Sequence, residues 1–583
     1  IIMKRKTRKL RFSGTGKDKD MIRGFVNHKI RKCRELSCAL WKFTALEGAE
    51  KGKIRHVMVP SCWETYPGME NYRGKAVYSR EFQGHGNVRL EFKGVSHTAR
   101  IQIDGKDAGL HYNAYTPFEI IAKGLDEGIH TLTVEADNSF SEASALHVPN
   151  DYHSYGGISR GVVLEELGEA YIQWLHFTPL KKGEDRWFGK AELCVCNLSE
   201  QLFEGSIKLS LGHKELAVFS VCLEGKETKT FKTEVFPCED VKEWNPETPE
   251  LYYVSAILKD KSEKDTDDMI ERIGFREIRI EGKDILLNGK KLYIKGLCRH
   301  EDHPQFGCAL PVSAMQYDLM LVKDLGANSI RTVHYPNDEL FLDLCDEQGI
   351  LVWEENHARG LSEEQMRNPH FEQQCEDCIY EMITAHYNHP SIYIWGILNE
   401  CASHTEYGKE CYKKQYELIQ RLDNSRPRSS ASCQFKTDIC FGLPDVVSYN
   451  IYPKWYHETP PKEYLEDLYQ WVQTDTEGEG KPFLVTEIGA GAIYGYRNPT
   501  QAKWTEEYQA DTLEEQITAV FEQEECSGLY LWQFCDTRVS ESWFHCRPRT
   551  MNNKGIVDEY RRRKLSYQVV KKLFRASAKP TAL

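Results

Sequence analysis

The strongest constraint in this sequence is an alternation of strand and helix patterns that begins near residue 280. Amphipathic helical segments end at Gly326 and Gly349, and a short apolar run follows each glycine. Eight candidate strands occur in this part of the chain: LYIKGLC, SIRTV, ILVWEE, IYIWGIL, SSASCQ, VVSYNIY, PFLVTEIG and GLYLWQF. Eight β/α units in about 300 residues predict a TIM (β/α)8 barrel over residues 280–583.

The sequence before the barrel has a different pattern of apolar residues, with no helical periodicity. In residues 21–168, Val88, Leu90 and Phe92 alternate with charged residues, and Asp104-Gly105 marks a hairpin turn. This pattern predicts a β jelly-roll sandwich. Residues 169–279 carry about seven short strands in roughly a hundred residues, which predicts an immunoglobulin-like β-sandwich. The expected fold class is therefore a multidomain α and β chain with a C-terminal barrel.

Charge and hydropathy exclude two classes of partner. The 583 residues include 75 basic and 88 acidic side chains, a net charge of −13, which argues against general nucleic-acid binding. No apolar stretch approaches the roughly 20 residues that span a bilayer, so we expect no membrane association. Residues 1–20 are basic but lack the apolar run of a secretory signal, and we interpret them as a disordered tail or an extension before Met21.

Cysteine usage indicates a reducing compartment. The 19 cysteines are scattered without a dense framework, as is typical of cytoplasmic proteins with free thiols. The closest pairs, Cys194/Cys196 and Cys375/Cys378, have no matching second pair nearby, so no metal site is expected.

Two acidic residues stand at the carboxyl ends of predicted barrel strands, where the active sites of such barrels lie. Glu400 ends IYIWGILNE on the fourth strand, and Glu487 ends PFLVTE on the seventh. Two carboxylates that face one cleft are what glycosidic bond cleavage needs, because one protonates the leaving oxygen while the other meets the developing cation. The alternative is that each is a solvated carboxylate at a strand end.

Six motifs together resemble one family over about residues 30–575. They are LNGKKLYIKGLCRHEDHP, IRTVHYP, WGILNE, SYNIYPKWY, LVTEIGA and LWQFCD. The ensemble resembles the bacterial β-glucuronidase branch of glycoside hydrolase family 2, which also contains β-galactosidases. The domain order of that family matches the three parts above. The chain passes almost directly from HARGLSEEQ into a helix, so it resembles gut-type members that lack an inserted loop over the active site.

The resemblance implies roles for particular residues. Glu400 corresponds to the general acid/base and Glu487 to the nucleophile of a retaining mechanism. Asn399 corresponds to the ligand of the sugar 2-hydroxyl, and Asp151 to a residue that reaches the site from the first domain. Further binding positions are His334, Asn450, Tyr452, Tyr456 and Trp532, of which Tyr452 would bind Glu487 and Trp532 would form a sugar platform. The alternative for these residues is barrel core, and for Asp151 a turn.

A last motif, MNNKGIVDEY, concerns the substrate. In the family, an Asn-x-Lys after the eighth strand binds the C6 carboxylate, and here Asn552 and Lys554 fill it. An ammonium and an amide donor suit that anion through charge-assisted hydrogen bonds. Arg547 and Arg549 lie upstream, and we take Arg549 as the arginine that faces the site, with Arg547 as the alternative.

The sequence thus predicts a retaining β-glucuronidase that releases glucuronic acid from conjugates or oligosaccharide ends. The alternatives are a β-galacturonidase or β-galactosidase of the same family and, more distantly, a non-catalytic carbohydrate-binding protein. No cofactor is expected to be required. Some relatives bind flavin mononucleotide at a surface site, but no phosphate-cradling glycine loop marks one here. The family also implies a homo-oligomer, with a tetramer favoured.

Overall fold

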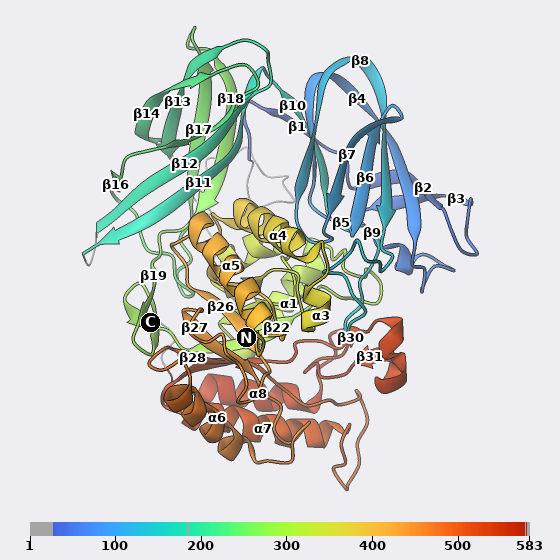
Figure 1. Ribbon diagram of the computed structural model, residues 1–583, viewed down its shortest axis with the longest axis vertical. Helices are drawn as coiled ribbons and strands as arrows, with labels where there is room; N and C mark the ends of the chain where they lie inside the picture. Colours follow the sequence, from blue (N-terminus) through green and yellow to red (C-terminus); the bar gives the residue numbers. More distant parts are fainter. Residues whose placement is uncertain (1–26, 184–185, 578, 580–583) are drawn as a thin grey trace, which may run out of the picture.

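The computed structural model describes residues 27–183, 186–577 and 579, and it consists of two β domains seated on an α/β domain (Figure 1). Residues 1–20, for which we expected a tail or extension, lie outside the described residues. Within the described residues, no helix combines the length and the apolar character needed to cross a membrane.

The first domain is an antiparallel sheet in the order β1-β10-β4-β8-β6-β7, to which β2 and β3 are added beside β4. The long strands β4 and β8 form its centre, and Val88, Leu90 and Phe92 are buried as their alternation predicts. The elements are β1 (Lys32–Glu35), β2 (Ala39–Ala45), β3 (Ile54–Val59), η1 (Trp63–Thr65), β4 (Lys75–Phe92), β5 (Val95–Ser96), β6 (Thr98–Ile103), β7 (Lys106–Tyr112), β8 (Phe118–Asp137), β9 (Gly157–Ile158) and β10 (Val162–Leu167).

The second domain consists of two antiparallel sheets that enclose one apolar core. One sheet joins β11, β12, β15 and β16, and the other has the order β14-β13-β17-β18. Its strands are β11 (Ala170–Lys182), β12 (Arg186–Asn197), β13 (Phe203–Leu211), β14 (Lys214–Leu223), β15 (Thr228–Lys232), β16 (Phe236–Cys238), β17 (Tyr252–Asp260) and β18 (Asp265–Ile273). A small sheet of β19 (Ile278–Glu281), β20 (Asp284–Leu287) and β21 (Lys290–Lys291) then leads into the third domain.

The third domain is a closed barrel of eight parallel strands, β22 to β29. All eight predicted strands are confirmed: β22 (Ile294–Arg299), β23 (Ser329–Thr332), β24 (Leu351–Glu355), β25 (Ile392–Gly396), β26 (Arg428–Ser432), β27 (Val446–Asn450), β28 (Phe483–Ile488) and β29 (Cys526–Leu531). The multidomain fold class with a C-terminal TIM barrel is therefore confirmed.

Helices surround this barrel, and a small hairpin follows its last strand. The helices are α1 (Val312–Leu325), α2 (Glu339–Gln348), α3 (Glu363–Met366), α4 (Phe371–His386), α5 (Glu406–Leu422), α6 (Pro461–Asp475), α7 (Glu506–Glu522) and α8 (Leu565–Ala576). The hairpin consists of β30 (Thr537–Arg538) and β31 (Met551–Asn552), with the short turns η2 (Glu541–Cys546) and η3 (Pro548–Thr550) between them. Gly326 and Gly349 end α1 and α2 in the left-handed conformation, as predicted.

The loop before β10 fastens the first domain onto the carboxyl end of the barrel. Arg160 donates to the Glu301 carboxylate at 2.8 Å and to the carbonyl oxygen of Pro336 at 2.7 Å, both in barrel loops. Ser540, beyond the last barrel strand, donates from its hydroxyl to the carbonyl of Tyr152 at 3.0 Å. These contacts hold the segment around Asp151 over the ends of the barrel strands.

A buried carboxylate joins the first and last parts of the barrel domain. Asp318 of α1 accepts from Arg299, at the end of β22, at 3.0 Å and from Arg561, before α8, at 2.8 Å. The side chains of all three are at most 3% exposed. Burial opposes ionisation, but the two guanidinium groups hold the pKa of Asp318 below its usual value.

We expect Asp318→Asn to destabilise the barrel by about 3–5 kcal/mol, because both arginines would lose their buried counter-charge. The measurement is the midpoint of thermal unfolding followed by circular dichroism. As the control, Glu200→Ala removes an exposed ion pair with Lys226, whose side chain is 59% exposed, and should leave the midpoint unchanged. Equal midpoints for the wild type and Asp318→Asn would contradict this role.

Candidate active site

Glu400 lies four residues beyond β25 and faces the neighbouring strands. Its backbone N–H donates to the carbonyl of Ala431 on β26 at 2.8 Å, and its carboxylate accepts from the amide of Asn450 on β27 at 2.9 Å. Its φ of 53° is left-handed, a conformation that costs energy in a residue with a side chain. The two bonds to neighbouring strands hold the carboxylate in place at the mouth of the barrel.

Glu487 lies on β28 and is almost completely buried. One carboxylate oxygen accepts from Arg331 at 3.0 Å and the other accepts from the hydroxyl of Tyr452 at 2.5 Å. Burial and the negative charge of Glu400 raise the pKa of Glu487 to about 8, although Arg331 and Tyr452 act in the opposite direction. The negative charges of the two glutamates therefore repel each other, as expected of two carboxylates in one site.

Arg331 connects most of the buried polar groups around Glu487. This fully buried guanidinium on β23 donates to both oxygens of Glu355, at 2.9 and 3.1 Å, and to the side-chain oxygen of Asn399 at 2.7 Å. Glu355 also accepts from His334 at 2.7 Å. The sequence analysis missed Arg331, although an arginine inside the apolar run SIRTV was a signal that a strand directs a charge into the barrel.

Several buried polar atoms in the site have no hydrogen-bond partner among the described residues. They are the side-chain nitrogen of Asn399, Nε2 of His334 and Oδ1 of Asn552. Buried polar atoms without partners are rare in folded proteins. These donors and acceptors, which come from separate loops, suit a ligand that carries several hydroxyl groups.

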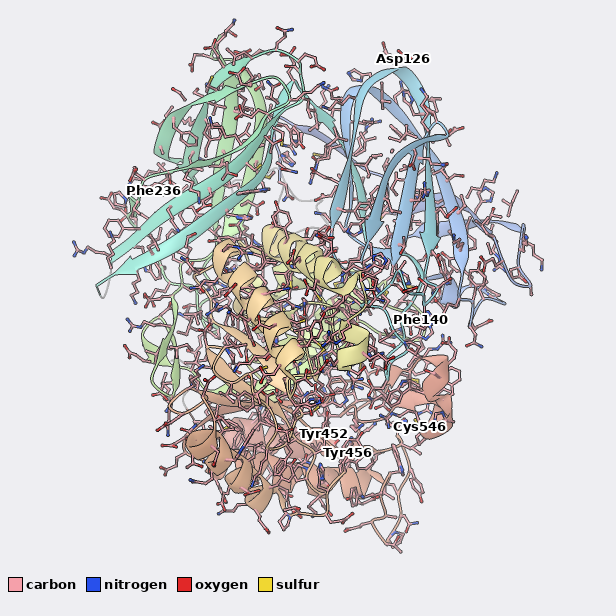
Figure 2. The ribbon with its side chains drawn as sticks, viewed as in Figure 1. Asp126, Phe140, Phe236, Tyr452, Tyr456 and Cys546 are labelled. Atoms are coloured by element: carbon pink, nitrogen blue, oxygen red, sulfur yellow. The ribbon has the colours of Figure 1, made fainter. Side chains whose placement is uncertain are left out.

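Lys554 supplies a buried positive charge beside these atoms. Its side chain forms no ion pair within the described part of the chain, and its Nζ lies 5.3 Å from the ring centre of Tyr456, 5.8 Å from that of Tyr452 and 5.9 Å from that of Trp455. Figure 2 labels Tyr452 and Tyr456 close together, and their ring centres are 5.2 Å apart. Burial alone would raise the pKa of Tyr456, but the ammonium of Lys554 lowers it. A buried ammonium without a carboxylate in direct contact suits an anionic ligand.

Comparison with known families agrees with this geometry. The family described as "Glycosyl hydrolases family 2, TIM barrel domain" matches residues 278–578, just over half of the chain, and "Glycosyl hydrolases family 2" matches residues 170–276. The chain belongs to glycoside hydrolase family 2. The predicted resemblance to the β-glucuronidase branch is confirmed by curated bacterial relatives of that name.

Three family 2 members illustrate this similarity. One is a β-galacturonidase from Eisenbergiella tayi, whose crystal structure was solved with bound galacturonate. Its sequence is 68% identical to this chain, and the two structures match with a TM-score of 0.94 over 95% of this chain and 99% of that one. A β-glucuronidase of Bacteroides fragilis is 28% identical over 87% of this chain and 76% of its own length. A "putative beta-glucuronidase" of Formosa agariphila is 27% identical over 83% of this chain, but the match spans only 61% of that protein.

The two arginines upstream of Asn552 are placed differently from our prediction. The guanidinium of Arg549 pairs with Glu559, whereas Arg547 approaches the carboxylate of Asp151 at 3.5 Å. Our choice of Arg549 over Arg547 is corrected accordingly. Arg549 lies in the turn η3 with a left-handed φ of 59°, whereas Arg547 is extended. The two side chains therefore leave the backbone in different directions.

Arg359, after β24, is a second residue that the sequence analysis missed. It lies 3.3 Å from Asp151 and 3.5 Å from Glu400. Burial alone would raise the pKa of Asp151, but the positive charges of Arg359, Lys554 and Arg547 lower it to about 2. Asp151, contributed by the first domain, is therefore an anion held among three cations, and it accepts from Asn552 at 3.2 Å.

The remaining predicted residue, Trp532, stacks on His334 with ring centres 5.1 Å apart.

Other clusters in the described residues lie outside this site. Asp343, Asp346 and His389 approach one another closely enough for a metal ion, as do His28, Cys33 and Glu165. In the first group His389 and Asp346 are already hydrogen-bonded at 2.6 Å, and in the second His28 lies 3.7 Å from Glu165. A cavity of about 1330 Å³ opens between the three domains, but none of the predicted catalytic or binding residues lines it.

We expect Arg331→Met to lower kcat/KM at least about 100-fold, because Glu355 and Glu487 would lose their shared counter-charge and Asn399 a donor. The measurement is steady-state hydrolysis of a chromogenic glycoside. Arg331→Lys should restore part of the loss, since it keeps the charge but not the forked geometry. Arg426→Met, which breaks a buried pair with Asp423 elsewhere, is the matched control. A folded Arg331→Met variant with normal kcat/KM would refute this positioning role.

Proposed function

We propose that this protein is an exo-acting, retaining β-uronidase and that its preferred substrates are β-D-galacturonides. The observation that carries the proposal is the buried ammonium of Lys554, which has no carboxylate partner among the described residues and lies in a cage of aromatic rings. A uronic acid differs from a neutral hexose by one carboxylate at C6, which this ammonium and the amide of Asn552 would bind. The 68% identity to a protein named as a β-galacturonidase supports the choice of sugar.

In the first half of the reaction, Glu400 acts as acid and Glu487 as nucleophile. Glu400 gives its proton to the glycosidic oxygen while the carboxylate of Glu487 attacks C1, and the aglycone leaves with the proton as an alcohol. The product on the enzyme is a glycosyl ester of Glu487. The unpaired side-chain nitrogen of Asn399 is available to donate to the 2-hydroxyl as the transition state forms.

In the second half, a water molecule replaces the aglycone. Glu400, now ionised, takes a proton from this water, whose oxygen attacks C1 and releases the sugar with its anomeric configuration retained. The carboxylate of Glu487 is regenerated and Glu400 is again protonated. Both half-reactions use only these two carboxyl groups and water.

The surroundings of the two glutamates determine where their proton lies. Burial and the negative charge of Glu400 raise the pKa of Glu487 to about 8, which favours a proton on Glu487 while no substrate is bound. Arg331 and Tyr452 stabilise a negative charge on Glu487 and have no such contact with Glu400. A glycosidic oxygen that accepts from Glu400 would therefore fix the proton on the acid and leave Glu487 ionised for attack.

A β-glucuronidase is the second candidate, as we predicted from the sequence. It is favoured by relatives of that name in Bacteroides fragilis and Streptococcus agalactiae. Galacturonic and glucuronic acid differ only in the direction of the C4 hydroxyl, so both would use Lys554 and the same pair of glutamates. A homo-oligomer with no required cofactor remains our proposal for the working form.

We expect 4-nitrophenyl β-D-galacturonide to be hydrolysed with the highest kcat/KM, the glucuronide with a lower one and the neutral galactoside with the lowest. The measurement is release of 4-nitrophenol from the three substrates under identical conditions. Glu487→Gln should reduce turnover of all three by at least about 1000-fold because the nucleophile is lost. A higher kcat/KM for the glucuronide would select the second candidate, and unchanged turnover by Glu487→Gln would refute the mechanism.

Replacing Lys554 tests the basis of uronate recognition. Lys554→Met should lower kcat/KM for the galacturonide about 10- to 150-fold, since a charge-assisted hydrogen bond is worth about 1.5–3 kcal/mol. Hydrolysis of the galactoside should change much less, because that sugar has no carboxylate. Lys454→Met is the control, as Lys454 pairs with Glu515. Equal losses on both substrates would show that Lys554 does not recognise the carboxylate.

A further inference from the structure

The loop between β25 and α5, which carries Glu400, has a strained backbone. The φ angles of Leu398 and Glu400 are 46° and 53°, and both lie in the left-handed region that residues with side chains disfavour. Backbone conformations of this kind persist only where the surrounding contacts enforce them. The contacts that hold this loop are therefore part of what places the carboxyl group of Glu400.

This loop is attached to the end of β26 at Glu400 itself. The N–H of Glu400 donates to the carbonyl of Ala431 at 2.8 Å, and the next and last residue of β26 is Ser432. Ser403, three residues beyond Glu400, is buried at 1% exposure. It marks the second point at which the loop is held.

Asp438, in the loop between β26 and β27, makes this second attachment. One oxygen of its carboxylate accepts from the hydroxyl of Ser403 at 2.5 Å and from the hydroxyl of Ser432 at 2.6 Å. The other oxygen accepts from the N–H of Cys440 at 2.7 Å. A single carboxylate oxygen therefore joins the loop of Glu400 to the end of β26.

The residues that follow Asp438 hold Ser403 by its backbone as well. The carbonyl oxygen of Ser403 accepts from the N–H of Ile439 at 3.1 Å and from the thiol of Cys440 at 3.2 Å. Both the hydroxyl and the carbonyl of Ser403 are thus bound by residues 438–440. We call Ser403, Ser432 and Asp438 the loop clamp.

The carboxylate of the loop clamp is buried away from positive charge. In the described part of the chain, Asp438 forms no ion pair with a lysine or arginine, so hydroxyl and amide donors replace the water that it has lost. Burial raises the pKa of Asp438, while these donors act in the opposite direction. Among the described residues none of its hydrogen bonds goes to Glu400 or Glu487. Asp438 can therefore act on the site only through the loop.

We propose that Asp438 is a positioning residue for the acid/base Glu400. This inference rests on the proposed function, in which Glu400 protonates the glycosidic oxygen and later takes a proton from water. By joining Ser403 to Ser432, Asp438 fixes the loop on the side of Glu400 that its own bond to Ala431 leaves free. Without this attachment the left-handed backbone at Glu400 relaxes and its carboxyl group moves away from the oxygen that it must protonate.

The nucleophile is held by a separate set of contacts. Arg331 on β23 and Tyr452 after β27 bind the two oxygens of Glu487. Within the described residues the loop clamp shares no hydrogen bond with these three. A misplacement of about 1 Å costs a reacting group about 100-fold in rate. Loss of Asp438 should therefore impair proton transfer while attack on C1 by Glu487 is retained.

The first test compares two aryl substrates that differ in their need for an acid. The leaving group of 2,4-dinitrophenyl β-D-galacturonide departs without protonation, whereas that of phenyl β-D-galacturonide requires it. Asp438→Ala should lower kcat/KM at least about 30-fold for the phenyl glycoside and less than about threefold for the dinitrophenyl glycoside, since a general acid contributes about 100- to 10,000-fold. Asp438→Asn, which keeps one accepting oxygen, should recover part of the loss.

The second test uses azide as a replacement for base catalysis. In Asp438→Ala, kcat for the dinitrophenyl glycoside should fall at least about tenfold, because water attacks the glycosyl ester without a well-placed base. Azide needs no base: its nitrogen bonds to C1, the ester bond breaks and the carboxylate of Glu487 is released. Added azide should therefore raise kcat of Asp438→Ala at least about threefold and yield β-galacturonosyl azide, with no change in kcat of the wild type.

Asp467→Ala is the matched control, because Asp467 of α6 binds Lys436 of the same loop at 2.7 Å on its exposed side. It should leave both kcat/KM values within about twofold of the wild type. If Asp438→Ala does not fold, Ser403→Ala replaces it, with an expected loss of about fivefold for the phenyl glycoside alone.

The outcomes separate this inference from the proposed function. Equal losses on the two substrates in a folded variant, normal kcat/KM on both, or no effect of azide would each overturn the positioning role of Asp438. If the wild type hydrolyses neither galacturonide, the proposed sugar is wrong, and the same comparison is then made with the corresponding glucuronides.

Discussion

The site depends on one buried guanidinium, that of Arg331. It is fully buried on β23, and it is stable there because carboxylates from β24 and β28 accept its hydrogen bonds. Removing two carboxylates and one arginine from water is costly, and only complete hydrogen bonding recovers that cost. The same contacts that satisfy Arg331 orient Glu487 and Asn399. The hydrogen bonds that stabilise the barrel interior therefore also fix the geometry of the candidate catalytic residues.

The architecture was readable from the sequence because the barrel strands are short apolar runs ended by glycines or polar residues. Glu400 and Glu487 could be proposed for the same reason, since each ends such a run. Arg331 and Arg359 were missed because a single charge inside or after an apolar strand has no periodic signal. Arg547 and Arg549 could not be separated because an irregular turn with left-handed residues decides where each side chain points.

The site is composite, and the barrel alone does not complete it. Asp151 comes from the first domain, and its loop is held by contacts with Glu301, Pro336 and Ser540 of the barrel domain. The hairpin of β30 and β31 brings Asn552 to the same place. Domain order in this family 2 protein therefore has a direct chemical consequence, because the first β domain supplies a charged group that the barrel strands cannot provide.

The aromatic cage around Lys554 also determines how dissolved salt acts on this protein. A chain with a net charge of −13 repels an anionic sugar at long range, and ions screen that repulsion beyond about 8–10 Å. The ammonium itself is buried among rings, where counter-ions do not reach it. Added salt should therefore speed the approach of the uronate that we propose as substrate while scarcely weakening its final contact, the opposite of what an exposed basic patch would produce.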